Sequence, residues 1–119
     1  MTALIALMSI GKGTWAHAIR LIESPEFERA IILTNSFGKE KYTAPKKASV
    51  VELDLRKEAK ELKEDMKIAL KPLIADEMEV AISIVSGTGI EHSALIAALF
   101  ESGVGFRIVI STSEEVQYL

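Results

Sequence analysis

Four short apolar runs recur along the chain and predict the strands of a buried sheet. They cover Thr2–Met8, Ala30–Leu33, Val80–Val85 and Phe106–Ile110. Nearly unbroken apolar runs of this length are typical of parallel strands that are covered on both faces. A fifth stretch, Ser49–Leu55, alternates apolar and acidic positions, which favours a strand at or near an edge of the sheet.

Three segments between these runs predict helices. Trp15–Ile22 and Arg56–Leu73 carry apolar residues at steps of three and four, which places them on one helical face. A third helix is expected to begin after Thr88, because Thr88 and Glu91 have the spacing of a capping box. It is expected to end at Gly103, a residue that suits a left-handed C-cap.

The order of these elements, β-α-β-β-α-β-α-β, predicts a single α/β domain over residues 1–119. Helices long enough to cross over separate most of the strands, so the sheet is expected to be mainly parallel. We predict a Rossmann-like, doubly wound, five-stranded sheet in the order 3-2-1-4-5, flanked by three helices. Lys39–Lys47 is expected to be an exposed loop, and Ser111–Glu115 has residues that can cap a further short helix.

Composition and charge narrow the classes of function. The 119 residues carry a formal net charge of −3, so neither a strongly basic face nor a duplex nucleic acid partner is expected. There is no cysteine, and neither of the two histidines has a carboxylate at zinc-motif spacing, so we expect no metal site and no cofactor. The run Ala3–Ile10 is too short to span a membrane and lacks the basic residues that precede a signal peptide core, which favours a cytoplasmic protein.

Two glycine-containing loops follow the first and fourth predicted strands, at Ser9–Thr14 and Ser86–Gly89. Glycine lets a ligand approach the backbone closely, and the free N–H groups of a first helical turn favour an anion. In a doubly wound sheet, ligands bind outside the carboxyl ends of the strands, where the strand order reverses. The sequence therefore predicts that the two loops meet there and receive a phosphate.

Neither loop completes a known nucleotide-binding motif. The Walker pattern needs a glycine five residues before Gly11, where Ala6 stands. It also needs a serine or threonine directly after Lys12, where Gly13 stands. The dinucleotide fingerprint is also incomplete, because the second strand does not end in an acidic residue.

The candidate ligand-binding residues lie in these two loops, in the turn after the second strand and in the first turn of the third helix. They are Ser9, Ile10, Gly11, Lys12, Gly13, Thr14, Asn35, Ser36, Ser86, Gly87, Thr88, Gly89 and His92. Ser9 and Lys12 suit a phosphate, and His92 suits ligand contact or proton donation. Their structural alternatives are a residue that ends a strand, an exposed loop charge and an exposed histidine of a first helical turn.

Other residues near the loops have two interpretations each. Thr88 is interpreted as a helix cap that can also line the site. Asn35 and Ser36 either read an adenine edge or cap a loop. Trp15, the only tryptophan, is assigned to core packing rather than base stacking, and His17 is assigned a structural role.

The layout of the chain resembles the CARF domain, the CRISPR-associated Rossmann fold. That family typically has an apolar strand ending in a Thr-Gly-Gly-Thr-Lys-like turn, then a helix rich in Ala, Ser and Met. Here Ser86–Gly89 stands at the turn, Ser93–Ala98 in the helix, and Gly103–Ile110 at the final loop and strand. Ser9–Gly13, after the first strand, is also similar. The resemblance covers the whole chain, although the second glycine is displaced and no lysine follows the turn.

The resemblance implies a homodimer that binds a cyclic oligoadenylate across its two-fold axis, as a stand-alone sensor in CRISPR defence. An alternative is a metal-independent ring nuclease, which would place the ribose 2′-hydroxyl in line with the phosphate. Its catalytic candidates are Ser9, Lys12 and His92, with Thr88 beside them. A third alternative is a Rossmann-like subunit whose apolar helix, Ser93–Phe100, docks onto a protein partner.

Overall fold

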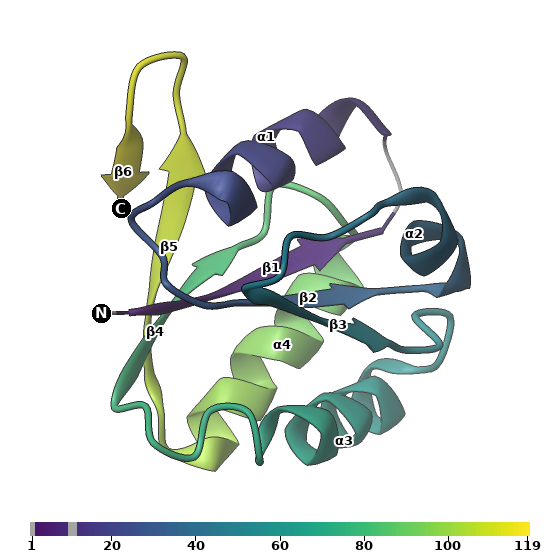
Figure 1. Ribbon diagram of the computed structural model, residues 1–119. Helices are drawn as coiled ribbons and strands as arrows, with labels where there is room; N and C mark the ends of the chain where they lie inside the picture. Colours follow the sequence, from purple (N-terminus) through teal and green to yellow (C-terminus); the bar gives the residue numbers. More distant parts are fainter. Residues whose placement is uncertain (1, 10–11) are drawn as a thin grey trace.

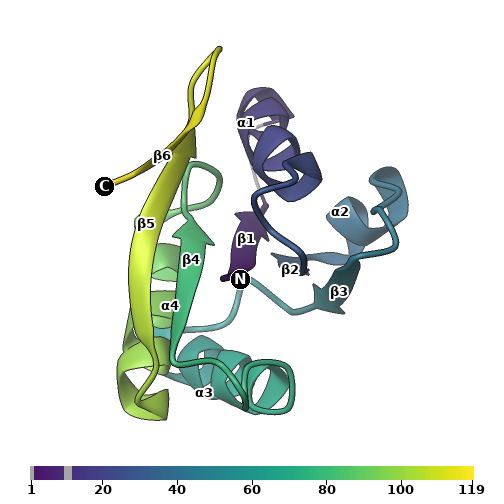
Figure 2. The ribbon, with the colours of Figure 1, turned by 60° about the vertical axis from the view of Figure 1, so that its left-hand side comes forward.

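The computed structural model describes residues 2–9 and 12–119, and of Lys12 it describes the backbone alone. The strands are β1 (Ala3–Met8), β2 (Ala30–Thr34), β3 (Ala48–Glu52), β4 (Glu79–Ser83), β5 (Gly105–Ser111) and β6 (Val116–Tyr118). The helices are α1 (Lys12–Glu23), α2 (Ser36–Lys41), α3 (Ala59–Leu70) and α4 (Gly89–Ser102). Helices α1 and α2 cover one face of the sheet, and α3 and α4 cover the other (Figures 1 and 2).

The sheet has the order β3-β2-β1-β4-β5-β6, which confirms the predicted Rossmann-like architecture and the order of its first five strands. These five strands are parallel, with β1 hydrogen-bonded to β2 on one side and to β4 on the other. The chain therefore reverses its winding direction between β1 and β4. A ligand-binding crevice is expected outside the carboxyl ends of these two strands.

Each face of the sheet buries its own apolar core. In β1, Leu4 and Met8 pack on the α1 side, whereas Ile5 and Leu7 face α3 and α4. Every residue of β1 is buried. Burial on both faces explains why this strand is encoded by an unbroken apolar run rather than by an alternating one.

Two elements were missed, so the predictions of five strands and three helices were wrong. Asn35 begins α2, because its side-chain oxygen accepts a hydrogen bond from the Gly38 amide at 2.9 Å. The expected helix cap at Ser111–Glu115 is instead a hairpin turn. There the Thr112 hydroxyl accepts from the Glu115 amide at 3.0 Å, and the Thr112 amide donates to the Glu115 carbonyl at 2.9 Å. This turn returns the chain as β6, antiparallel to β5.

The boundaries of α1 and α3 also differ from the prediction, with α3 ending at Leu70 rather than at Leu73, whereas the end of α4 is confirmed. Helix α1 begins at Lys12, so Gly13 and Thr14 belong to a helical turn rather than to a loop. Helix α3 begins only at Ala59, because the Asp54 carboxylate accepts from the Arg56 amide at 3.1 Å and holds a turn there. Helix α4 ends as predicted at Gly103, whose φ is +73°.

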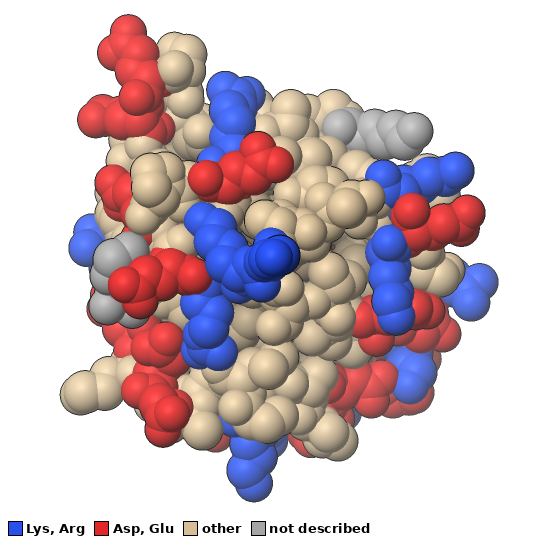
Figure 3. Space-filling view, viewed as in Figure 1, with Lys and Arg blue, Asp and Glu red and all other residues tan. Residues whose placement is uncertain are grey.

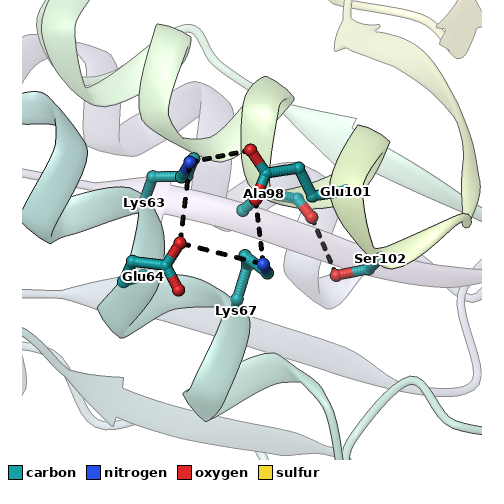
Figure 4. Close-up of polar contacts among 6 residues, drawn as sticks. All are labelled: Lys63, Glu64, Lys67, Ala98, Glu101 and Ser102. Carbon is teal, nitrogen blue, oxygen red and sulfur yellow. Dashed lines mark hydrogen bonds and ion pairs between the residues drawn. The ribbon is translucent and has the colours of Figure 1, made fainter.

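Helices α3 and α4 are joined at the surface by a cluster of ion pairs (Figure 4). Glu101 of α4 accepts from Lys63 at 2.7 Å and from Lys67 at 2.8 Å, both on α3. Glu64 completes the cluster at longer distances from the same two ammonium groups. Within the described ranges, none of the helices combines the length and the apolarity needed to cross a lipid bilayer.

Candidate functional site

Ser9, after β1, lies beside the loop that follows β4, where the sheet reverses its winding (Figure 1). The Ser9 amide, directly after β1, donates to the Ser86 hydroxyl at 3.0 Å. The Thr34 hydroxyl, at the end of β2, donates to the Met8 carbonyl at 2.6 Å, which ties the end of β2 to that of β1. Residues far apart in the sequence are thus gathered at one edge of the sheet.

Glu91 occupies the centre of this arrangement with its own carboxylate. Its Oε1 accepts a hydrogen bond from the Ser9 hydroxyl at 2.6 Å and from the Thr88 amide at 3.2 Å. Thr88 Oγ1 in turn accepts from the Glu91 amide at 3.2 Å, which confirms the predicted capping box. Glu91 is only 5% exposed. The anion-favouring end of the 14-residue helix α4 therefore already holds an internal anion.

His92 and Gly87 complete the wall around this carboxylate. His92 Nε2 lies 2.9 Å from the Ser86 carbonyl oxygen. A carbonyl can only accept, so Nε2 carries the proton in this contact. Gly87 has φ +107°, and a Cβ atom there would lie 2.8 Å from Glu91 Oε1 and 2.7 Å from Leu7 Cδ2. Only glycine lets the backbone pass this close to the carboxylate.

We call Ser9, Ser86, Thr88, Glu91 and His92 the switch-point cluster. Trp15 supports it from α1, because its Nε1 donates to the Ser9 carbonyl at 3.0 Å. Its ring is 8% exposed and lies in the core on the α1 side of the sheet, which confirms its assignment to core packing. Trp15 therefore holds the Ser9 backbone in place and leaves the serine hydroxyl to Glu91.

The remaining candidates that the structure describes are spread along the same edge of the sheet. Gly13 and Thr14 lie in the first turn of α1, and Gly89 is the first residue of α4. Ile10 and Gly11 lie outside the described residues, as does the side chain of Lys12. The described candidates for phosphate binding thus follow the carboxyl end of β1 or of β4 along the chain.

Asn35 and Ser36 lie farther along this edge, beyond the end of β2. They line a hollow of about 440 Å³ with Phe37 and with residues 52–56 at the end of β3. Asn35 acts as a helix cap, as its loop-capping alternative implied, and still borders this hollow. Phe37 was not among the predicted residues. Phe37 is 45% exposed, and the centroid of its ring lies 5.9 Å from that of Trp15.

A larger hollow, of about 710 Å³, lies at the opposite edge of the sheet, near the amino ends of β4 and β5. It is lined by the C-terminal parts of α3 and α4 and by Glu77, Gly103 and Val104. Its acidic and basic groups are largely paired, because Glu77 contacts Arg29 and Glu101 contacts two lysines. The switch-point cluster is the better candidate site, because it lies at the carboxyl ends of the strands, where doubly wound sheets bind ligands.

The described surface has mixed charge. Figure 3 shows lysine and arginine side chains in the middle of one face with acidic side chains on both sides of them. No group of three or more His, Asp or Glu side chains in the described ranges is placed to hold a metal ion. The chemistry that the cluster offers is hydrogen bonding by amides and hydroxyls, together with one buried carboxylate.

Fold and site together define a doubly wound α/β domain with a polar cluster at its switch point. No protein-family model and no curated protein sequence matches the chain. Among solved structures, it is similar to a Csm6 from Enterococcus italicus bound to cyclic hexa-2′-fluoro-hexa-dAMP. The TM-score is 0.58 at 9% identity, over 98% of this chain and 35% of the Csm6 chain.

The chain is also similar to the C-terminal domain of the PF1911 hydrogenase from Pyrococcus furiosus. That match has a TM-score of 0.52 at 16% identity and covers 90% of each chain. At these identities both likenesses concern the fold. The chain corresponds to about a third of the Csm6 chain, given the 35% coverage.

Proposed function

We propose that this chain is a CARF-like module that binds a cyclic oligoadenylate, a second messenger of CRISPR defence. The observation that carries the proposal is the fold likeness, over 98% of the chain, to part of a Csm6 whose structure contains a cyclic oligonucleotide. The sequence resemblance to the CARF family points to the same ligand. The hydrogen bonds that join Ser9 to Ser86 and Glu91 support a site at the ends of β1 and β4.

In this proposal the phosphates lie over the loops after β1 and β4. Backbone amides of Gly87 and of the first turn of α1, with the Ser9 hydroxyl, are the donors. Lys12 supplies positive charge, which the site needs because Glu91 brings a negative one. Ile10 and Gly11 are included as backbone contacts on the strength of the sequence pattern.

The hollow beyond β2 offers a place for an adenine. An exposed aromatic ring can stack on a base, and an asparagine amide can pair with an adenine edge. Phe37 and Asn35 supply these two groups at the border of the hollow, with Ser36 between them. Its volume of about 440 Å³ lies within the range of small-molecule sites.

A homodimer is part of the proposal, because a cyclic ligand with two-fold symmetry fits a site shared by two copies. Helix α4 begins beside the switch-point cluster. It exposes Ile90 to 59% at its first turn and Phe100 to 71% near its end. These apolar side chains suit a contact between two α4 helices, which would bring both clusters to one ligand.

Titration calorimetry with cyclic tetraadenylate and cyclic hexaadenylate tests the binding. We expect one of the rings to bind with heat at tens of micromolar. Lys12→Ala should weaken binding about tenfold or more, because a charge-assisted contact is lost. Lys60→Ala, on the exposed side of α3, is the matched control and should bind normally. Absence of heat with either ring would sink the proposal.

The ring nuclease remains a second candidate, favoured by one observation. The Ser9 hydroxyl is held at 2.6 Å from the buried Glu91 carboxylate, a group able to accept a proton. Incubation of labelled ring with EDTA separates the candidates. Linear products that disappear in Ser9→Ala, at ring concentrations that saturate the variant, indicate cleavage. If the ring is still intact after prolonged incubation, the protein binds the ring and does not cleave it.

A further inference from the structure

The carboxylate of Glu91 uses donors that an incoming phosphate would also need. It takes the Ser9 hydroxyl and the Thr88 amide, and a hypothetical Cβ at Gly87 would lie 2.8 Å from the same oxygen. Glu91 and Ser9 are both 5% exposed. The carboxylate is thus held inside the switch-point cluster rather than extended into solvent.

This carboxylate has no cationic partner within the described part of the chain, where no salt bridge involves Glu91. Its charge is stabilised by hydrogen bonds and by the N-terminal end of α4. A phosphate has the same sign of charge and needs the same donors, and like charges at about 4 Å repel strongly in a partly buried site. The two anions cannot occupy the donors together.

We propose that Glu91 is an internal competitor of the ligand: its carboxylate leaves Ser9 and Thr88 when a ligand phosphate binds. This inference rests on the proposed function of the site. The capping bond from the Glu91 amide to Thr88 Oγ1 does not depend on the side chain, so α4 keeps half of its capping box when the carboxylate turns outward. Glu91 lies in the first turn of α4, and in this proposal rotation of its side chain carries the carboxylate out of the cluster.

Competition of this kind raises the apparent dissociation constant by the inverse of the fraction of molecules in which the site is open. Inorganic phosphate makes few other contacts that could offset this loss of affinity. A cyclic oligoadenylate adds base and ribose contacts in two subunits and can displace the carboxylate. Glu91 is therefore a specificity-determining residue, which excludes small phosphates and admits the ring.

Glu91→Gln tests the inference, because glutamine keeps the size and the capping oxygen but removes the charge. Calorimetry compares the wild type, Glu91→Gln and the control Glu58→Gln with cyclic tetraadenylate, cyclic hexaadenylate and inorganic phosphate. Glu58 is the N-cap of α3 and makes no side-chain capping bond. We expect Glu91→Gln to bind the ring about tenfold more tightly and to gain measurable phosphate binding, whereas Glu58→Gln behaves as the wild type.

The outcomes separate the inference from the proposed function. If wild type and Glu91→Gln bind the ring equally, or the variant binds it more weakly, the inference is wrong and the function stands. If neither protein binds either ring, both fail.

A second measurement uses the wild type alone, in case the variant folds poorly. The ¹³C resonance of the Glu91 side-chain carboxyl should move towards its solvent-exposed position when the ring is added. An unchanged resonance at saturation would overturn the inference.

Discussion

At the scale of single residues, the site depends on a backbone that passes unusually close to a buried carboxylate. Gly87 has φ +107°, a conformation that side chains other than glycine rarely adopt. A hypothetical Cβ at this position would meet a methyl group of Leu7 and a carboxylate oxygen of Glu91. The loop after β4 can therefore close over Ser9 only with glycine at this position.

Gly87→Ala should lower the free energy of unfolding by about 1–3 kcal/mol, because it combines strain with a close contact. Urea unfolding followed by circular dichroism measures the loss. Gly89→Ala is the control, since a Cβ at Gly89 meets no atom within 4 Å and the residue is helical. Equal unfolding midpoints for the two variants would contradict this account of the loop.

Part of the site could be predicted from the sequence at this scale. The spacing of Thr88 and Glu91 predicted the cap, because a capping box is a local pattern. The contact between Ser9 and Glu91 joins positions 82 residues apart, so it depends on the order of the strands. Once β1 and β4 are placed side by side, a capping glutamate in the first turn of α4 lies close to the end of β1, and this was the signal available for Glu91.

At the scale of secondary-structure elements, α3 and α4 pack through apolar side chains and are also joined by ion pairs at the surface. Leu62 and Met66 of α3 are fully buried, as are Leu95 and Leu99 of α4. At the surface beside these residues, Glu101 accepts hydrogen bonds from Lys63 and Lys67. These bonds, that from Lys63 most of all, lower the pKa of Glu101 to about 2 from an ordinary value of 4.5. The folded state therefore binds a proton at Glu101 less readily than the unfolded chain does.

This difference predicts how stability responds to acid. A lowered folded-state pKa contributes stability that is complete above about pH 4.5 and is lost as the pH falls towards about 2. Glu101→Gln should lower the urea midpoint at pH 7 and flatten its fall over that pH range. Glu40→Gln, whose carboxylate has no ion pair in the described ranges, is the control. A profile for Glu101→Gln that parallels the wild type would refute the role of the cluster.

Long periodic elements were predictable and short capped ones were not. The strands in the middle of the sheet and the helices α1 and α3 have an apolar pattern that reports burial directly, whereas α4 was predicted from its capping box and from Gly103. Helix α2, of six residues, and strand β6, of three, are too short for such a pattern. Their formation is decided by single side-chain contacts, from Asn35 and Thr112 respectively.

At the scale of the whole molecule, the strand order determines which loops lie next to each other. Five parallel strands place all their carboxyl ends along one edge, and the strand order reverses there between β1 and β4, which is where doubly wound sheets bind ligands. Because crossover connections are right-handed, the sequence order of strands and helices was enough to predict this edge. What the edge binds depends on side chains brought together only by folding.

The oligomeric state belongs to this scale. If two copies share one ligand, size-exclusion chromatography with light scattering should give twice the mass of the chain. Ile90→Asp should yield a monomer that remains folded, because aspartate is tolerated in a first helical turn. Ile68→Asp, on α3 and 72% exposed in the wild type, should leave the dimer intact. A wild-type protein that is monomeric with and without the ring would contradict the shared site.

The most direct test of the account is where a cyclic oligoadenylate contacts the protein. Two-dimensional ¹H–¹⁵N NMR during titration with cyclic tetraadenylate or hexaadenylate reports each backbone amide. We expect the largest shifts at Ser9, Gly87 and Thr88, with smaller ones at Ser36 and Phe37. Shifts concentrated around Lys71 and Gly103, at the opposite edge of the sheet, or no shifts at all, would contradict a ligand site at the carboxyl ends of β1 and β4.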